Sequence, residues 1–168
     1  MKVLIDSNIL ISAALNSNGT PYQAYLKAVT FPNHGLICEQ NIDELRRIFN
    51  RKFPNRIAAL EQFLSIALMT LELVPTPIEE YHAENKIRDV KDRPILRAAI
   101  HANADVLLTG DKDFLESGLH TPKIMTASDF LTDTPPGSRL PYRIPLSFPH
   151  PFFSLSFFSI FDILHCKA

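Results

Sequence analysis

Several features that would point to other classes of protein are scarce in this sequence. The chain of 168 residues has only two cysteines, Cys38 and Cys166, which is too few for a disulfide framework or a thiolate metal site. The six histidines show no H-x-x-x-H spacing, and neither a G-x-S-x-G motif nor a phosphate-binding loop nor a dinucleotide fingerprint occurs. These absences give no support to serine or cysteine nucleophile chemistry and favour a reducing, cytoplasmic setting.

Long apolar runs and an excess of charge of one sign are also missing. The first apolar run meets a carboxylate at Asp6, too early for a secretory signal. The apolar stretch at residues 152–164 has roughly 13 residues, whereas a membrane-spanning helix needs about 20. We therefore expect no export and no membrane span. The formal net charge of -1 leaves nucleic-acid binding open, because such binding depends on where charges cluster.

Short apolar strands alternate with helical segments along most of the chain. Asp92 is expected to cap the helix that Arg93 and Pro94 open, and Thr126 or Ser128 the last helix. This alternation predicts an α/β protein, a three-layer α/β/α sandwich around a central parallel twisted sheet. We expect strands at residues 2–5, 36–38, 71–74, 105–109 and 123–125, and helices at residues 20–29, 56–70 and 78–88, from Asn41 and from Arg93.

The composition changes near Asp133. Prolines at positions 135, 136, 141, 145, 149 and 151 alternate with phenylalanines, and proline at this density excludes a central strand or helix. We therefore expect one domain over residues 1–132. A Pro/Phe-rich tail over residues 133–168 is expected to be irregular or disordered, or to dock on an apolar groove.

Carboxylates follow the predicted strands and lie near the starts of helices. Because parallel sheets bind ligands beyond the carboxyl ends of their strands, such acids are expected to meet there. Divalent cations such as Mg²⁺ or Mn²⁺ take oxygen ligands, and in phosphodiester hydrolysis they stabilise developing charge and activate water. Without a cation these acids would raise one another's pKa values. The sequence therefore predicts a metal site with the ligands Asp6, Glu44, Asp92, Asp111 and Asp113, supported by Ser7, Asn8 and Thr109.

Each of these acids also has a plainer interpretation. Asp6 and Asp92 can be helix N-caps, and Glu44 can be an acid favoured by the dipole of its helix. Asp111 and Asp113 can belong to a simple turn. What favours the metal site is that the two strongest strand candidates both end in aspartate.

The sequence resembles the PIN domain family in the order and spacing of several segments. These are residues 3–10 (VLIDSNIL), 44–46 (ELR), 89–96 (DVKDRPIL), 104–115 (ADVLLTGDKDFL) and 124–131 (IMTASDFL). The resemblance implies a nuclease, most often one that acts on RNA. Many bacterial members are toxins of the VapC type that a cognate antitoxin silences, so it also implies an antitoxin partner and suggests a homodimer.

By motif position, the resemblance makes Asp6, Glu44, Asp92 and Asp111 the metal-binding, catalytic acids. Asp113 would be auxiliary. Ser7 stands where threonine is common in the family, which is a mild departure. The tail resembles nothing in the family and is a larger one.

Basic residues next to these acids are candidates for contact with substrate phosphates. We expect this role for Arg46, Lys91, Arg93 and Lys112. Arg46 belongs to a basic cluster with Arg47, Arg51, Lys52 and Arg56 that can also be an ordinary solvated helix surface.

Two rival classes each lack a residue that they need, whereas two other roles for a PIN fold remain open. A phosphatase of the haloacid-dehalogenase type needs a second aspartate two residues after the first, where this chain has Asn8. A receiver domain needs a phosphate-contacting lysine after a later strand, and none is evident. A PIN fold without significant catalysis, acting as a binding module, and a housekeeping RNA-processing nuclease both remain alternatives to a toxin.

Overall fold

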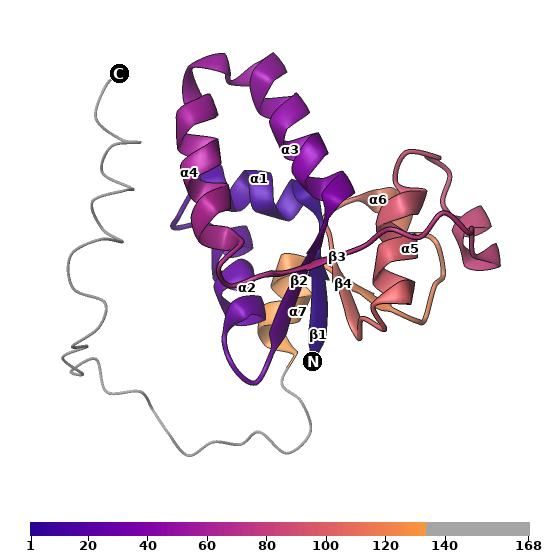
Figure 1. Cartoon of the computed structure of the whole chain (residues 1–168). Coiled ribbons are helices and arrows are strands. Elements are labelled where there is room, and N and C mark those ends of the chain that lie inside the picture. Colours follow the sequence, from indigo (N-terminus) through magenta and orange to yellow (C-terminus); the bar gives the residue numbers. More distant parts are fainter. Residues whose placement is uncertain (134–168) are drawn as a thin grey trace, which may run out of the picture. The chain divides into compact units, whose positions relative to one another are not determined.

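Five parallel strands form the single sheet of the described part of the protein. The computed structural model describes residues 1–133, so the predicted tail, apart from Asp133, lies outside the described residues. The strands are β1 (Lys2–Ile5), β2 (His34–Cys38), β3 (Glu72–Val74), β4 (Val106–Leu108) and β5 (Lys123–Met125), in the order β3-β2-β1-β4-β5 (Figure 1). With β1 and β4 adjacent at the centre, the residues that follow them are neighbours.

Helices cover both faces of the sheet (Figure 1). Val3 and Ile5 of β1 face one core, whereas Leu4 between them faces the other, as the alternation of side chains in a strand requires. This confirms the predicted α/β/α sandwich. The first core contains α1 (Ser7–Leu15), α2 (Thr20–Val29), α3 (Glu39–Lys52), α4 (Ile57–Ala67) and α7 (Ala127–Thr132), with the short helix η1 (Pro54–Arg56) between α3 and α4; the second contains α5 (Arg93–His101) and α6 (Lys112–Leu115).

The start of α3 differs from the prediction. The sequence places its cap at Asn41, but the helix begins at Glu39 and Cys38 is the N-cap. Oδ1 of Asn41 accepts a hydrogen bond of 3.3 Å from the backbone N–H of Cys38. Asn41 therefore stabilises the start of the helix from its third position, as the distal residue of a capping box does.

The helix predicted at residues 78–88 is wrong. This segment contains only the short helix η2 (His82–Lys86). Arg97 of α5 donates to the carbonyl oxygens of Pro77 and Ile78, at 3.2 and 3.3 Å, and its guanidinium binds both carboxylate oxygens of Glu84. A tertiary partner therefore takes the carbonyls that a continuous helix would bond internally.

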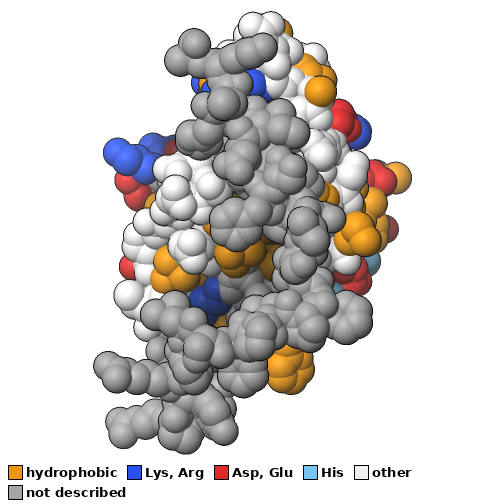
Figure 2. All heavy atoms as spheres, turned by 90° about the vertical axis from the view of Figure 1, so that its left-hand side faces the viewer, with side chains coloured by type: hydrophobic (Ala, Val, Ile, Leu, Met, Phe, Trp, Pro, Cys, Tyr) orange, Lys and Arg blue, Asp and Glu red, His pale blue; other side chains and the backbone are white. Residues whose placement is uncertain are grey.

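One face of the described part is mixed in character. Among the coloured side chains that Figure 2 shows, hydrophobic ones lie in groups between polar ones and basic ones lie beside acidic ones. None of the helices in residues 1–133 combines the length and the apolar character that crossing a membrane requires.

Candidate metal and nuclease site

Asp6 lies at the carboxyl end of β1, buried against β4. Its backbone N–H donates to the carbonyl of Leu108 at 2.9 Å, which continues the pairing of the two strands. Oδ1 accepts from the backbone of Ser7 at 2.6 Å, and Oδ2 accepts from Asn8 Nδ2 at 2.7 Å and from Thr109 Oγ1 at 2.6 Å. Asp6 is thus the N-cap of α1 and also the centre of a polar network.

The electrostatic surroundings of Asp6 oppose its ionisation. Burial raises the pKa of Asp6 to about 6, against the hydrogen bonds from Thr109 and Ser7, and the nearby negative charge of Glu44 adds to the increase. The residue is only 3% exposed. A cation at this place would favour the ionised form of the carboxylate.

Ser7 connects Asp6 to Glu44 on α3. Its hydroxyl donates to Glu44 Oε2 at 2.5 Å and lies 3.3 Å from Asp6 Oδ1. The other oxygen of Glu44, Oε1, accepts from the guanidinium of Arg47 at 3.0 Å. The Ser7 hydroxyl therefore brings the acid of α3 beside the acid of β1.

Asp111 enters the same network through the loop after β4. Its backbone N–H donates to Thr109 Oγ1 at 3.0 Å, and Gly110 N–H donates to Asn8 Oδ1 at 3.0 Å. The carboxylate of Asp111 caps α6 by accepting from the backbone of Asp113 at 2.8 Å. The chain segments after β1 and β4 are thus fixed to each other.

The side chain of Asp92 has no hydrogen-bond partner within residues 1–133. Asp92 occupies the N-cap position of α5, as predicted, but its side chain makes no capping hydrogen bond. Burial and, after it, the negative charges of Asp6, Asp89, Asp111 and Glu44 together raise the pKa of Asp92 to about 7. The four predicted catalytic acids are therefore close enough to repel one another.

The other predicted site residues point to partners around this group. Asp113 pairs with Arg88, Arg46 pairs with Glu61 of α4 at 2.8 and 2.9 Å, and Arg93 Nε donates to the carbonyl of Ile87 at 3.1 Å. Lys91 and Lys112 are exposed. The structure thus brings Asp6, Glu44, Asp92 and Asp111 together and turns Asp113 and Arg46 towards other charges.

The donor set has the chemistry of a site for a hard divalent cation. It consists of carboxylate oxygens. In two of the acids, Asp6 and Asp92, burial and nearby negative charge raise the pKa. As the side chains stand within residues 1–133, however, no group of three or more Asp, Glu, His or Cys is arranged to hold a metal ion. The oxygens of Asp6, Glu44 and Asp113 face protein donors instead. These residue types suit a divalent metal ion. To bind one, the carboxylates would have to give up some of these hydrogen bonds and ion pairs.

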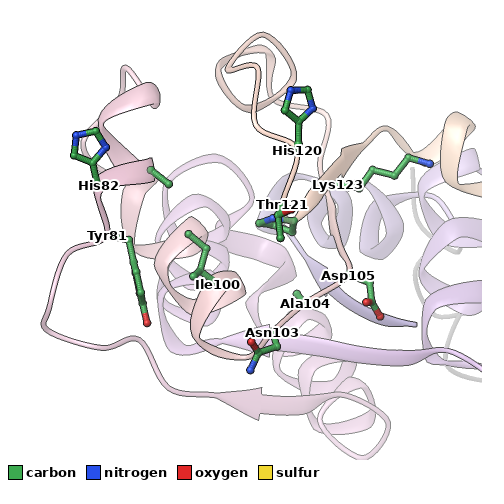
Figure 3. A pocket seen from close by; sticks show the side chains of 11 residues that line it. Tyr81, His82, Ile100, Asn103, Ala104, Asp105, His120, Thr121 and Lys123 are labelled. Atoms are coloured by element: carbon green, nitrogen blue, oxygen red, sulfur yellow. The ribbon is translucent and has the colours of Figure 1, made fainter.

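Two open hollows lie at opposite ends of β4. One, of about 520 Å³, is lined by one of the four acids, Asp111, and by Asn8 and Gly110 together with hydroxyl residues of α1, α2 and α7. The other, of about 670 Å³, is lined by residues that include Asn103, Asp105 and His120 (Figure 3). Because Asp105 precedes β4 and Asp111 follows it, only the first hollow is placed to serve the acids.

Sequence reasoning missed three residues around the acids. Arg88 pairs with Asp113, Arg47 pairs with Glu44 rather than only joining the basic cluster, and Asp89 contributes to the raised pKa of Asp92. The spacing of Glu44 and Arg47, three residues apart on one helix, is the one signal that could have predicted a pair. No local pattern connects Arg88 with Asp113, because 25 residues separate them.

A comparison with solved structures finds the same fold elsewhere. A chain from the crystal structure of VapBC2 from Rickettsia felis, bound to a DNA fragment from their promoter, superposes with a TM-score of 0.56 at 19% sequence identity. The match covers 75% of this chain and 97% of the other. No curated protein matches.

The family assignment rests on the sequence itself. The family model described as PIN domain matches residues 2–113, a stretch that contains β1 to β4 and all five predicted metal ligands. This chain belongs to the PIN domain family.

Proposed function

We propose that this protein is a metal-dependent ribonuclease that hydrolyses RNA phosphodiester bonds. The observation that carries the proposal is the group of four acids to which Asp92 belongs. The carboxylate of Asp92 has no hydrogen-bond partner in residues 1–133, and the neighbouring acids repel its negative charge. A family of nucleases and a set of hard oxygen donors support the same conclusion.

The proposed ligands of Mg²⁺ or Mn²⁺ are Asp6, Glu44, Asp92 and Asp111, with Asp113 as an auxiliary. A divalent cation bound there would activate water and stabilise the charge that develops on the phosphate. Ser7, Asn8 and Thr109 orient the carboxylate of Asp6, because each donates a hydrogen bond to it or lies beside it.

The proposed path of the RNA runs through the 520 Å³ hollow beside Asp111. Lys91, Arg93 and Lys112 flank the acids in sequence and are proposed to contact phosphates. Arg46, for which the sequence predicts the same role, would first have to give up its two hydrogen bonds to Glu61. It is therefore the weakest of the four candidates.

We also propose that the protein acts as the toxin of a toxin–antitoxin pair in the cytoplasm. The neighbour of known structure comes from a VapBC2 complex, and this supports an antitoxin as partner of the present chain. A homodimer is proposed from the family resemblance. Arrest of bacterial growth on expression, relieved by co-expression of an antitoxin encoded beside this gene, would separate a toxin from a housekeeping RNA-processing nuclease.

The test of the catalytic proposal is Asp92→Asn. Because the side chain of Asp92 makes no hydrogen bond within residues 1–133, the amide should leave the fold intact while removing a ligand charge. We expect cleavage of a fluorescent single-stranded RNA in Mg²⁺ or Mn²⁺ to fall roughly a hundredfold or more, and chelation by EDTA to abolish it in the wild type.

Asp43→Asn is the matched control. Asp43 is exposed on α3 next to Glu44, so this variant loses the same charge outside the acid group and should keep its activity. Equal activity of Asp92→Asn and the wild type would contradict the proposed site.

A binding module without catalysis is the second candidate. It is favoured by one observation, that the acid side chains of the described part are not already arranged to hold a metal ion. Wild-type protein that binds an antitoxin but cleaves no RNA in Mg²⁺ or Mn²⁺ would support this role instead.

A further inference from the structure

Two arginines pair with two of the five predicted metal ligands. Arg47 Nη2 lies 3.0 Å from Glu44 Oε1. Arg88 Nη2 contacts Asp113 Oδ1 and lies 3.6 Å from Glu116 Oε2. The two arginines come from different parts of the chain, α3 and the segment before α5, so two separate segments each supply a guanidinium to a predicted ligand.

Both arginines are much more exposed than the carboxylates with which they pair. The side chains of Arg47 and Arg88 are 60% and 71% exposed, whereas those of Glu44 and Asp113 are each only 23% exposed. Exposed ion pairs contribute little net free energy, because the long side chain loses entropy and water screens the charges. The carboxylates are anchored at the site, and the guanidinium groups reach them from the solvent.

These guanidinium groups occupy the oxygens that a cation would need. With Arg47 on Oε1 and Ser7 on Oε2, both oxygens of Glu44 are engaged. A divalent cation that binds Glu44 would neutralise the carboxylate and weaken its attraction for Arg47. The same reasoning applies to Asp113 and Arg88.

We propose that Arg47 and Arg88 are exchangeable counter-ions of the acid group. They neutralise Glu44 and Asp113 when no divalent cation is bound, and they contact the phosphates of RNA on either side of the cleaved bond when one is bound. This inference rests on the proposed ribonuclease function. Arginine suits the second role because its planar guanidinium offers paired donors to phosphate oxygens.

Two other arginines of the protein show what this exchange requires. Arg97 is buried on Glu84, with only 11% of its side chain exposed, and is not free to leave. Arg46 is exposed like Arg47 and lies on the same helix, but its partner Glu61 is outside the acid group. Only Arg47 and Arg88 combine an exposed guanidinium with a partner among the predicted ligands in the described part of the chain.

The first measurement is Mn²⁺ affinity without RNA, by calorimetry or electron paramagnetic resonance. Arg47→Ala and Arg88→Ala remove a competitor, so each variant should bind Mn²⁺ about 2- to 5-fold more tightly than the wild type. Arg46→Ala loses the same charge from the same helix without freeing a ligand and should leave Mn²⁺ affinity unchanged. Weaker or unchanged Mn²⁺ binding in both test variants would overturn the inference.

The second measurement is the affinity for a fluorescent single-stranded RNA, by anisotropy, in EDTA and in Ca²⁺. In EDTA the arginines are engaged with the acids, so the test variants should bind RNA nearly as the wild type does. In Ca²⁺ they should bind it about 5- to 10-fold more weakly, and the dependence of log affinity on log salt should fall by about one for each arginine. Equal losses in EDTA and Ca²⁺ would show ordinary surface charges and contradict the exchange.

The wild type separates this inference from the function on which it rests. Wild-type protein that binds neither Mn²⁺ nor RNA would refute the proposed function. A second outcome is that the wild type binds Mn²⁺ and RNA and cleaves RNA, while the variants show neither tighter Mn²⁺ binding nor weaker RNA binding in Ca²⁺. In that case the inference alone fails.

Discussion

Two regions of this protein bury a carboxylate, and the groups that contact the carboxylate differ in charge between them. Glu84 in η2 is 1% exposed, and the two hydrogen bonds from Arg97 hold the pKa of Glu84 below its usual range. Asp6 is 3% exposed at the end of β1, and burial raises the pKa of Asp6 to about 6. The first acid is neutralised by the protein itself, whereas the second is held by neutral donors only.

The difference indicates what each region contributes. Burying an acid without a cationic partner costs free energy, and sites where a protein accepts this cost are commonly functional. The contact of Glu84 with Arg97 shows that this fold can supply a guanidinium to a buried acid. No guanidinium pairs with Asp6 or Asp92 within residues 1–133, and the divalent cation proposed above would supply the missing positive charge.

The largest expected effect comes from breaking the neutralised region. Arg97→Ala leaves Glu84 buried without its partner and should lower the free energy of unfolding by roughly 3 kcal/mol, measured by urea denaturation. Adding Glu84→Gln to Arg97→Ala removes the unpaired charge and should recover part of the loss. A single variant as stable as the wild type would mean that the pair does not hold η2 in place.

A divalent cation should stabilise the acid group by a similar amount. At a Mg²⁺ or Mn²⁺ concentration about 100 times the Kd, binding to the folded protein alone adds roughly 2.7 kcal/mol to the free energy of unfolding. Asp92→Asn should lose most of this gain, whereas Arg97→Ala should keep it despite its lower stability. Equal gains in wild type and Asp92→Asn would place the cation elsewhere.

The sequence predicted the sheet and the convergence of the acids well, because both depend on local patterns. Apolar runs that end in Asp6 or at Thr109 identify parallel strands whose carboxyl ends meet, and parallel pairing of β1 with β4 follows the rule for such sheets. Capping residues such as Thr126 were equally readable, and its side chain does cap α7.

The remaining features depend on contacts between distant segments. The helix expected at residues 78–88 does not form, and Arg97 instead donates hydrogen bonds to backbone carbonyls about 20 residues away. Arg88 and Arg46 likewise find their acids by tertiary packing. A side chain with several donors has many possible partners in a sequence, and only the fold selects one.

The pH dependence of stability should have opposite signs in the two regions. In EDTA the raised pKa values of Asp6 and Asp92, about 6 and 7, mean that the folded protein binds more protons than the unfolded chain between about pH 4 and pH 7. Their contribution to the free energy of unfolding therefore falls as the pH rises through this window. The pKa of Glu84 is lowered from its usual value of 4.5. The contribution of Glu84 to the free energy of unfolding is therefore fully present above pH 4.5 and is lost as the pH falls below 4.5.

Urea denaturation in EDTA at intervals from pH 3 to pH 8 measures both contributions. Asp92→Asn should remove the decrease between pH 6 and pH 7, and this variant should be more stable than the wild type at pH 8 in EDTA. A wild type whose stability rises steadily from pH 5 to pH 7, with no difference from Asp92→Asn, would show that Asp92 titrates as an ordinary exposed acid.

The smallest effect is expected for the pair of Arg46 with Glu61, which repeats the geometry of the buried pair at the surface. Its two hydrogen bonds, 2.8 and 2.9 Å, match those of Arg97 with Glu84, 2.8 and 2.7 Å. The side chains of Arg46 and Glu61 are 50% and 44% exposed, however, so water already solvates the charges and salt screens them. Arg46→Ala should therefore lower the free energy of unfolding by less than about 1 kcal/mol in urea denaturation, and the difference should shrink further in 1 M NaCl. A loss as large as that of Arg97→Ala would mean that geometry, rather than burial, determines what an arginine contributes in this fold.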